Sequence, residues 1–214
     1  MKEIRFENVV PHVFQHVTAW QSDVWHCQLT LKKGKCYLVE AESGQGKSTF
    51  CSYIGGWRND YTGTIYFDDA DVKSLKTNDW VDLRRRHISC LFQDLRLFPE
   101  LTAMENIEIK NQLTDAKRRE EIMSWFEKMG IADKKDVKVG QMSFGQQQRV
   151  AFMRALSQPF DFLLADEPIS HLDDRNAAIM QQIMMDEAQK QGAGIIITSI
   201  GKHPDMKYDA IIKL

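Results

Sequence analysis

One stretch decides the fold of this 214-residue chain, YLVEAESGQGKST at residues 37–49. A short apolar strand runs into a glycine-rich turn, and we expect a helix to begin near Lys47, which is the context that a phosphate-binding loop requires. Gly44 and Gly46 let the backbone curl so that its N–H groups point at phosphate oxygens, and the helix N-terminus adds a favourable dipole. A chance glycine-rich turn does not account for the strand, the helix and the Gly-Lys-Ser-Thr run together. The stretch therefore predicts a nucleotide-binding protein.

The polar side chains of this loop have separate expected roles. Lys47 is expected to bridge the β- and γ-phosphates, Ser48 to ligate Mg²⁺ through its hydroxyl, and Thr49 to hydrogen-bond on the α-phosphate side. Ala41 stands where the loop pattern begins with glycine. The other residues of the loop predicted to contact the nucleotide are Ser43, Gly44, Gln45 and Gly46.

A second motif ends in two acids. The apolar run Phe162–Ala165 leads directly into Asp166 and Glu167. If the run is a buried core strand, both carboxylates lie at the phosphate-facing edge of the sheet, where they need a cation. Asp166 suits the outer sphere of Mg²⁺, and Glu167 is placed to polarise a water for attack on the γ-phosphate. The alternative is that the two acids cap the helix that follows Pro168.

The rest of the chain alternates short apolar runs with helical patterns, which is typical of α/β proteins with a parallel central sheet. From Thr102 to about Ser157 the spacing is helical, and a later helix starts near Asp174. We expect an antiparallel edge sheet from 4–10, 24–31 and 64–67, the last after a turn at Gly63. The nearly all-apolar runs expected to form the parallel core are 36–41, 88–92, 162–165 and 195–198, and a last strand is expected at 210–212.

Bulk composition excludes several function classes. With 28 basic and 30 acidic residues the net charge is −2, so the chain lacks the basic footprint of a nucleic-acid-binding protein. No signal peptide and no apolar run of bilayer length is present, so we expect no direct insertion and any membrane role to come through a partner. Cysteines without CxxC spacing are expected to be reduced, buried thiols, namely Cys27, Cys36, Cys51 and Cys90.

A third motif, MSFGQQQR at Met142–Arg149, closely resembles the LSGGQxQR signature of ATP-binding cassette (ABC) proteins. Ser143 and the N–H groups from Gly145 onward, at the start of a helix expected over Gln146–Leu156, form a candidate anion site. The resemblance extends over essentially the whole chain. It implies an α/β P-loop NTPase cassette of one domain, 1–214, with a mainly parallel core sheet, an antiparallel β edge subdomain and an inserted helical subdomain at about 94–157.

The same resemblance implies roles for residues outside the phosphate loop. Glu167 becomes the general base, and Gln93, in a stretch similar to the Q-loop, reaches Mg²⁺ and the attacking water. Ser143, Gly145 and Gln146 are expected to contact the ATP of a second subunit, so that ATP holds a head-to-tail homodimer together. The implied catalytic residues are thus Glu167, Gln93 and Lys47, and the implied Mg²⁺ ligands are Ser48, Gln93 and Asp166. Asp173, in a run similar to the D-loop, is expected to contact the opposite phosphate loop.

Two further assignments are implied for apolar side chains. An aromatic from the N-terminal sheet is expected to stack on adenine, and Phe14 lies closest to the required position, with Trp20 and Trp25 as alternatives. Aromatic residues at a sheet edge more often belong to the core. Leu97 and Phe98 are expected to be exposed at the groove that accepts a helix of a membrane permease, and ordinary loop packing is the alternative.

The chain departs from the family pattern in two places. Phe144 replaces the first glycine of the signature pair. The histidine expected just after the last core strand is absent, because Ser199 or Ile200 occupies its place. His203 lies three or four residues further on and substitutes only if the loop folds back. The hypothesis is that ATP binds and dimerises the protein while turnover is slow.

The implied function is that of an ATP-hydrolysing subunit, with ATP and Mg²⁺, that powers a separately encoded membrane permease. It would act in the cytoplasm, peripheral on the inner face of the cell membrane. The segment around Leu83–Arg86 and the Q-loop resembles cassettes of lipoprotein-release, macrolide-export and cell-division systems. Two alternatives stay open: a regulatory cassette of the cell-division type that signals through a permease-like partner, and a slow or degenerate ATP-dependent switch.

Overall fold

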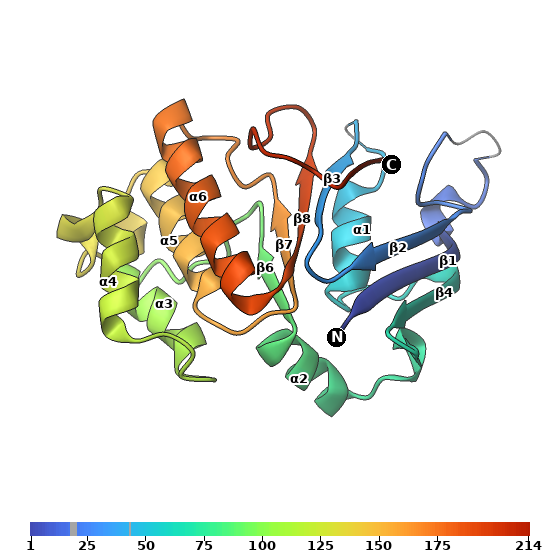
Figure 1. The fold of residues 1–214 in the computed structure, drawn as a ribbon, viewed down its shortest axis with the longest axis horizontal. Coiled ribbons are helices and arrows are strands. Elements are labelled where there is room, and N and C mark those ends of the chain that lie inside the picture. Colours follow the sequence, from blue (N-terminus) through green and yellow to red (C-terminus); the bar gives the residue numbers. More distant parts are fainter. Residues whose placement is uncertain (18–20, 43) are drawn as a thin grey trace.

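A five-stranded parallel sheet forms the centre of the molecule. The structure is a computed structural model, and it describes residues 1–17, 21–42 and 44–214. The strand order of this sheet is β6-β7-β8-β3-β9, and each neighbouring pair is parallel. Figure 1 shows β6, β7, β8 and β3 side by side in this order. The expected parallel core is therefore confirmed. The strands are β3 (Cys36–Glu40), β6 (Ile88–Leu91), β7 (Phe162–Asp166), β8 (Gly194–Ser199) and β9 (Ala210–Lys213).

Alternate residues of the core strands face two different hydrophobic clusters. On β3, Leu38 packs into one cluster while Tyr37 and Val39 pack into the other, and on β8 Ile195 and Ile196 are divided in the same way. Successive side chains of a strand point to opposite faces, so both faces of this sheet are buried. This explains why the core strands are almost wholly apolar in sequence.

Six α-helices and four short 3₁₀ helices are described around the sheets. Between β6 and β7 the chain forms α3, α4 and α5, which lie together on one side of the molecule, while α1 lies between the two sheets (Figure 1). Helix α2 was not indicated by the sequence patterns. The α-helices are α1 (Lys47–Ile54), α2 (Thr77–Arg86), α3 (Ala103–Asn111), α4 (Arg119–Lys128), α5 (Phe144–Leu156) and α6 (Asp174–Gln191); the 3₁₀ helices are η1 (His12–Phe14), η2 (Val72–Ser74), η3 (Ala132–Lys134) and η4 (Val139–Gln141).

A four-stranded antiparallel sheet in the order β2-β1-β4-β5 forms the expected edge sheet. The turn expected at Gly63 is wrong, because Gly63 lies inside a strand that begins at Tyr61. It has a φ of +79°, and a Cβ there would lie 2.3 Å from the carbonyl oxygen of Asn8, so glycine is required where the register shifts. The strands are β1 (Glu3–Pro11), β2 (Gln28–Lys32), β4 (Tyr61–Phe67) and β5 (Ala70–Asp71).

The strand expected over residues 24–31 begins only at Gln28. The hydroxyl of Ser22 accepts hydrogen bonds from the N–H groups of Val24 and Trp25, at 3.0 and 2.9 Å. This local turn competes with extended pairing, which is the usual effect of a serine side chain on nearby backbone. Val24 and Trp25 are still buried, but as an anchor beneath the phosphate loop rather than as part of the sheet.

The cysteines are all free thiols, as expected. Cys36 and Cys51 are buried, but Cys27 and Cys90 are half-buried, so the expectation that all four are buried is wrong for these two. Cys27 lies in the turn that replaces the start of the expected strand, and Cys90 lies on β6 at the outer side of the core sheet.

Candidate functional site

The phosphate loop joins β3 to α1 and is held in shape by its own side chains. Gly44 and Gly46 have φ values of +87° and +96°, which favour glycine. The amide oxygen of Gln45 accepts a hydrogen bond from the N–H of Glu42 at 2.9 Å, while the Gln45 carbonyl accepts one from the indole of Trp25 at 3.3 Å. A Cβ on Gly46 would lie 2.8 Å from the ring of Phe14, so this glycine also admits the aromatic neighbour. Ser43 lies outside the described residues.

Lys47, the first residue of α1, forms ion pairs with both acids at the end of β7. Its ammonium contacts a carboxylate oxygen of Glu167 and lies 3.4 Å from Oδ1 of Asp166. Lys47 and Glu167 are only 8% and 7% exposed. Buried charges of this kind are stable when they are paired, so the lysine compensates the two carboxylates within the protein.

Gln93 and an unusual backbone conformation fix the position of Glu167. The side-chain amide of Gln93 donates a hydrogen bond to Oε2 of Glu167 at 3.2 Å. Glu167 has a φ of +49°, and its N–H donates to the carbonyl oxygen of Thr198 at 3.0 Å. Left-handed conformations of residues other than glycine are uncommon and cluster at functional sites. The strand end therefore presents the Glu167 carboxylate in a defined place.

Two adjoining cavities bring most of the predicted site residues together. The first, of about 430 Å³, lies over the phosphate loop, and the second, of about 290 Å³, lies against it and shares Ser48 and Gln93 with it. Asp166 lines the second cavity. The first is lined by Val13, Phe14, Glu42, Gly44, Gly46, Lys47, Ser48, Thr49, Gln93, Glu167 and Ile200.

The donor set of the second cavity fits Mg²⁺. Ser48, Gln93 and Asp166 each offer an oxygen, which is the ligand type that this hard cation prefers. Within the described ranges no group of three or more His, Cys, Asp or Glu side chains is close enough to hold a metal. A site with few protein oxygens suits Mg²⁺, because this ion usually completes its shell with substrate phosphates and water.

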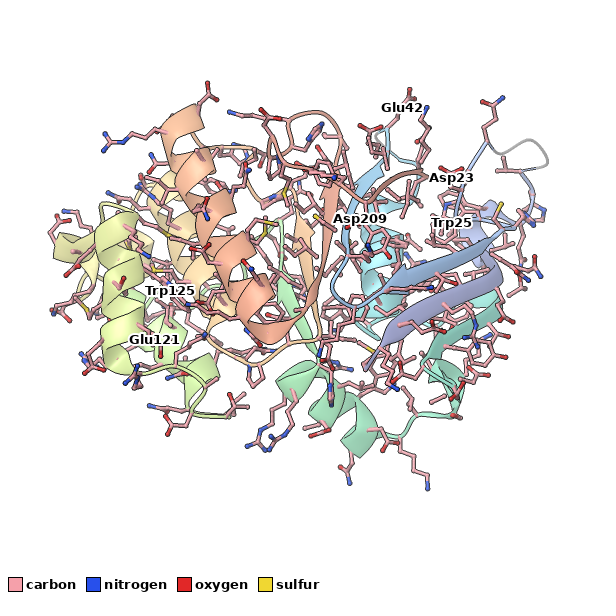
Figure 2. All side chains as sticks on the ribbon, viewed as in Figure 1. Asp23, Trp25, Glu42, Glu121, Trp125 and Asp209 are labelled. Atoms are coloured by element: carbon pink, nitrogen blue, oxygen red, sulfur yellow. The ribbon has the colours of Figure 1, made fainter. Side chains whose placement is uncertain are left out.

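The aromatic residues near the loop differ in their accessibility. Phe14, at the end of η1, is half-buried and lines the first cavity beside Gly46. Trp25 is 1% exposed and has no ring face open to a base, so it supports the loop instead. Trp25 and Glu42 both lie in the half of the molecule that carries the edge sheet, and Trp125 lies in the other, helical half (Figure 2). The second alternative, Trp20, lies outside the described residues.

The signature residues form a helix cap of their own. Helix α5 begins at Phe144, two residues earlier than expected, with Ser143 as its N-cap. The Ser143 hydroxyl accepts from the N–H of Gln146 at 3.4 Å, and the Gln146 side chain accepts from the N–H of Ser143 at 2.9 Å. Gly145 has no atom closer than 3.7 Å to the place of a Cβ. None of these residues lines the cavities around Lys47.

Neighbouring contacts tie the signature to the ends of β7 and α6. The side-chain amide of Gln148 donates to the carbonyl oxygen of Pro168 at 2.8 Å, directly after Glu167. Phe144 is 46% exposed and its ring meets that of His171 edge-on, with centroids 4.7 Å apart. Asp173 caps α6 by accepting from the N–H of Asn176 at 2.8 Å. The signature and the D-loop-like run therefore share one surface.

The segment after Gln93 is held by two residues that the sequence patterns did not single out. Arg154 of α5 donates to the carbonyl oxygens of Leu95 and Arg96, each at 2.6 Å, and both residues have positive φ. Asn106, fully buried in α3, accepts from the N–H of Phe98 at 2.8 Å and donates back to its carbonyl oxygen at 3.0 Å. Both residues lie in helices, where a polar side chain is usually exposed, so the sequence does not indicate that they hold a distant backbone segment.

The two apolar residues of this segment differ. Phe98 is 50% exposed, as expected. Leu97 is half-buried and packs against the helical hydrophobic cluster, so its expected exposure is wrong. Asn106 holds the backbone of Phe98 through two hydrogen bonds, and from this held segment the preceding Leu97 packs against the helical cluster.

No imidazole lies at the described cavity that contains Glu167. His203 hydrogen-bonds to the carbonyl oxygen of Pro204 at 3.1 Å, and its ring lies edge-on to Tyr208. The Ser199 hydroxyl closes its own turn by donating to the carbonyl oxygen of Lys202 at 3.0 Å. Ile200, which is 57% exposed, lines the rim of the cavity instead. The loop does not fold back to bring His203 to Glu167.

Comparison with known sequences gives a consistent result. A family model described as "ABC transporter" matches residues 24–170. The uncharacterized ABC transporter ATP-binding protein YvrO of Bacillus subtilis (strain 168) is 34% identical over 190 residues, 86% of this chain and 81% of that protein. The macrolide export ATP-binding/permease protein MacB of Shewanella sp. (strain ANA-3) is 32% identical over 192 residues, 87% of this chain. The chain spans 29% of the length of that macrolide export protein.

Comparison with solved structures supports the same fold. The dimeric structure of MJ0796, described as a bacterial ABC transporter cassette, superposes with a TM-score of 0.83 at 27% identity, covering 99% of this chain and 94% of that one. A dimeric post-hydrolysis state of MJ0796 bound to ADP and Pi has a TM-score of 0.80 over the same shares of both chains. The expected fold class is confirmed.

Proposed function

The chain belongs to the ABC transporter family, and from this premise we propose that it binds ATP with Mg²⁺ and hydrolyses it as the energy-supplying subunit of a membrane transporter. One observation carries the proposal. Lys47 and Gln93, which are distant in sequence, both contact the Glu167 carboxylate beside a cavity lined by a phosphate-binding loop. This is the set of groups that in-line attack on a phosphate needs: a cation, a carboxylate base and an orienting amide.

Nucleotide binding must rearrange the ion pairs of the site. The phosphates of ATP would take over Lys47, which releases Glu167 from its ion pair and leaves its carboxylate free to accept a proton from water. Gln93, already bonded to Glu167, would orient that water. The N–H groups of the loop and the start of α1 face the phosphate charge. Mg²⁺, held through Ser48, Gln93 and Asp166, would supply neutralisation of the phosphate oxygens.

A single chain offers the two halves of an ATP sandwich on separate surfaces. The capped start of α5 carries Ser143, Gly145 and Gln146 but lines neither cavity around Lys47. We therefore assign these three residues to the ATP of a second copy, and Asp173 to contact with the opposite phosphate loop. ATP between two copies buries its phosphates against two helix N-termini, which opposes dissociation until hydrolysis.

Replacing Gly145 with aspartate tests the composite site. The position has room for a side chain, since the nearest atom to a Cβ lies 3.7 Å away, so the monomer is expected to keep its fold. The new carboxylate would repel the phosphates of the partner's ATP. In a Glu167→Gln background we expect Gly145→Asp to abolish the ATP-dependent dimer in light scattering, with ATP affinity of the monomer within about twofold of the parent. Gly145→Ala is the matched control; dimerisation of the aspartate variant would contradict the proposed sandwich.

A permease is the partner expected at the membrane. No helix in the described part of the chain is both long and apolar enough to cross a bilayer. Exposed Phe98, in the segment that follows Gln93, offers an apolar contact for a permease, which would hold the cassette at the cytoplasmic face of the membrane. With a net charge of −2 a nucleic-acid partner is not proposed. A regulatory cassette that signals through a permease-like partner uses the same residues.

A slow ATP-dependent switch is the second candidate function. It is favoured by the placement of Ile200 at the cavity rim and of His203 against Pro204 and Tyr208, which leaves the attacking water without an imidazole partner. On this proposal the dimer forms with ATP, and its lifetime is set by slow turnover.

Introducing a histidine at residue 200 tests that candidate. Ile200 lines the cavity and is exposed, so an imidazole there can reach the phosphates without displacing core atoms. We expect Ile200→His to raise the steady-state ATPase rate about tenfold, a modest share of what a positioned acid–base group contributes. Lys207→His is the control, because Lys207 is exposed and lines neither cavity. If the wild type hydrolyses ATP quickly and Ile200→His does so at the same rate, the slow switch is excluded.

A further inference from the structure

Thr198 lies on β8, beside the end of β7 that presents the two acids of the site. It pairs with Asp166 in the parallel register, is fully buried, and has no role in the chemistry described above. A buried hydroxyl must find a hydrogen-bond partner, since leaving it unpaired forfeits its hydration without compensation. The partners that it finds connect it directly to the candidate Mg²⁺ ligand.

Each of two polar groups of Thr198, its hydroxyl and its carbonyl oxygen, contacts a different acid of the site. Its hydroxyl donates to Oδ1 of Asp166 at 2.5 Å, a short distance that is typical of a hydroxyl bound to a carboxylate. Its carbonyl oxygen accepts the N–H of Glu167 at 3.0 Å. Within the described residues, Oδ2 of Asp166 accepts no hydrogen bond, so the same carboxylate keeps one oxygen for a ligand.

A third residue lies against the Thr198 hydroxyl. Sγ of Cys51, one turn along α1 from Lys47, lies 3.9 Å from the Thr198 hydroxyl oxygen. Burial raises the pKa of the Cys51 thiol well above its ordinary value, so the thiol keeps its proton and donates it. The Thr198 hydroxyl then donates its own proton to Asp166. The hydrogen bonds thus run from Cys51 through Thr198 to the carboxylate.

We propose that Thr198 is a positioning residue for Mg²⁺-dependent nucleotide binding, which it serves by holding Oδ1 of Asp166 so that Oδ2 faces the metal. The inference rests on the proposed function. Hydrogen-bond partners of metal-binding carboxylates fix the orientation of the ligand, and their loss typically weakens metal affinity 10- to 100-fold. Thr198 sits far from the phosphate loop in sequence but beside it in the sheet, since β8 lies between β7 and β3.

Binding of β,γ-imido ATP by isothermal titration calorimetry, in Mg²⁺ and in EDTA, tests the proposal. We expect Thr198→Val, which keeps the side-chain shape, to weaken binding in Mg²⁺ about tenfold and to leave binding in EDTA within about twofold of wild type. Thr198→Ser, which restores the hydroxyl, should recover binding in Mg²⁺ to within about threefold. Equal losses in Mg²⁺ and EDTA, or failure of serine to rescue, would overturn the proposal.

A double-mutant cycle with Asp166→Asn separates positioning from a structural role. If Thr198 acts through Asp166, Thr198→Val has no further effect on Mg²⁺-dependent binding once Asp166 is replaced, whereas independent effects would add. Additive losses would refute the positioning role. If Thr198→Val does not fold, Cys51→Ala gives the second test. It should weaken binding in Mg²⁺ but not in EDTA, and no change in either condition would contradict the positioning role.

Wild-type protein distinguishes this inference from the proposed function. If the wild type binds the ATP analogue no better with Mg²⁺ than with EDTA, the proposed function itself fails. If the wild type requires Mg²⁺ and Thr198→Val behaves identically, the positioning role alone fails.

Discussion

Replacing Glu167 with glutamine is expected to reduce steady-state ATP hydrolysis at least 100-fold while ATP binding persists. Glutamine keeps the length of the side chain and an oxygen that can accept the hydrogen bond from Gln93, but it cannot take a proton from water. The loss is therefore that of the general base, which contributes about 10²- to 10⁴-fold. Phosphate release by the purified protein, with calorimetric titration of ATP, measures both quantities.

The same variant should accumulate the dimer. If hydrolysis dissolves the ATP sandwich, Glu167→Gln with ATP and Mg²⁺ is expected to elute as a dimer and the wild type mainly as a monomer. Glu100→Gln, an exposed glutamate away from both cavities, is the matched control and should retain wild-type hydrolysis. Retention of more than about a tenth of the wild-type rate by Glu167→Gln would show that another group acts as the base.

Replacing Lys47 with alanine is expected to lower ATP affinity at least 100-fold. Lys47 is the cationic side chain of the phosphate loop that lines the first cavity, where the phosphates are expected to bind. Calorimetric titration with ATP and Mg²⁺ measures the effect. The control Lys128→Ala, an exposed lysine at the end of α4, should bind as wild type does.

Lys47→Ala carries a second consequence for stability. It removes the cation that Glu167 and Asp166 share in a largely buried site, and breaking a buried pair typically costs about 3–5 kcal/mol. Adding Glu167→Gln removes one uncompensated carboxylate, so the double variant should regain part of the lost thermal stability but none of the lost affinity. A Lys47→Ala variant that is destabilised yet still binds ATP tightly would contradict the assigned role.

Local sequence is sufficient for the parts of the site that follow one another in the chain. The turn at Gly44 and Gly46, Lys47 at the start of a helix, and Asp166 and Glu167 at the end of an apolar strand depend on spacing over fewer than ten residues. The positive φ values of the glycines arise from the missing side chain itself. The structure brings these residues to one pair of cavities, while their chemical roles stay predictions.

Other expectations failed where a neighbour decided the outcome. The strand expected at residues 24–27 is replaced by a turn because the hydroxyl of Ser22 captures two backbone N–H groups. Leu97 is turned inward by a segment that Asn106 holds. Neither side chain disturbs the hydrophobic pattern from which strands and exposed loops are inferred, so periodicity carries no trace of these contacts.

The sequence by itself determined the parallel core, the nucleotide loop and the acids that face it, because these follow from local spacing and from the apolar character of buried strands. Only the tertiary structure decided that Thr198 holds Asp166, that Arg154 holds Leu95 and Arg96, and that Ile200 rather than His203 lines the cavity over the phosphate loop. The physical reason is that these contacts join residues far apart in the sequence, 32 positions for Thr198 with Asp166 and 59 for Arg154 with Leu95, and their partners are chosen by strand register and helix packing, which no short stretch of sequence encodes.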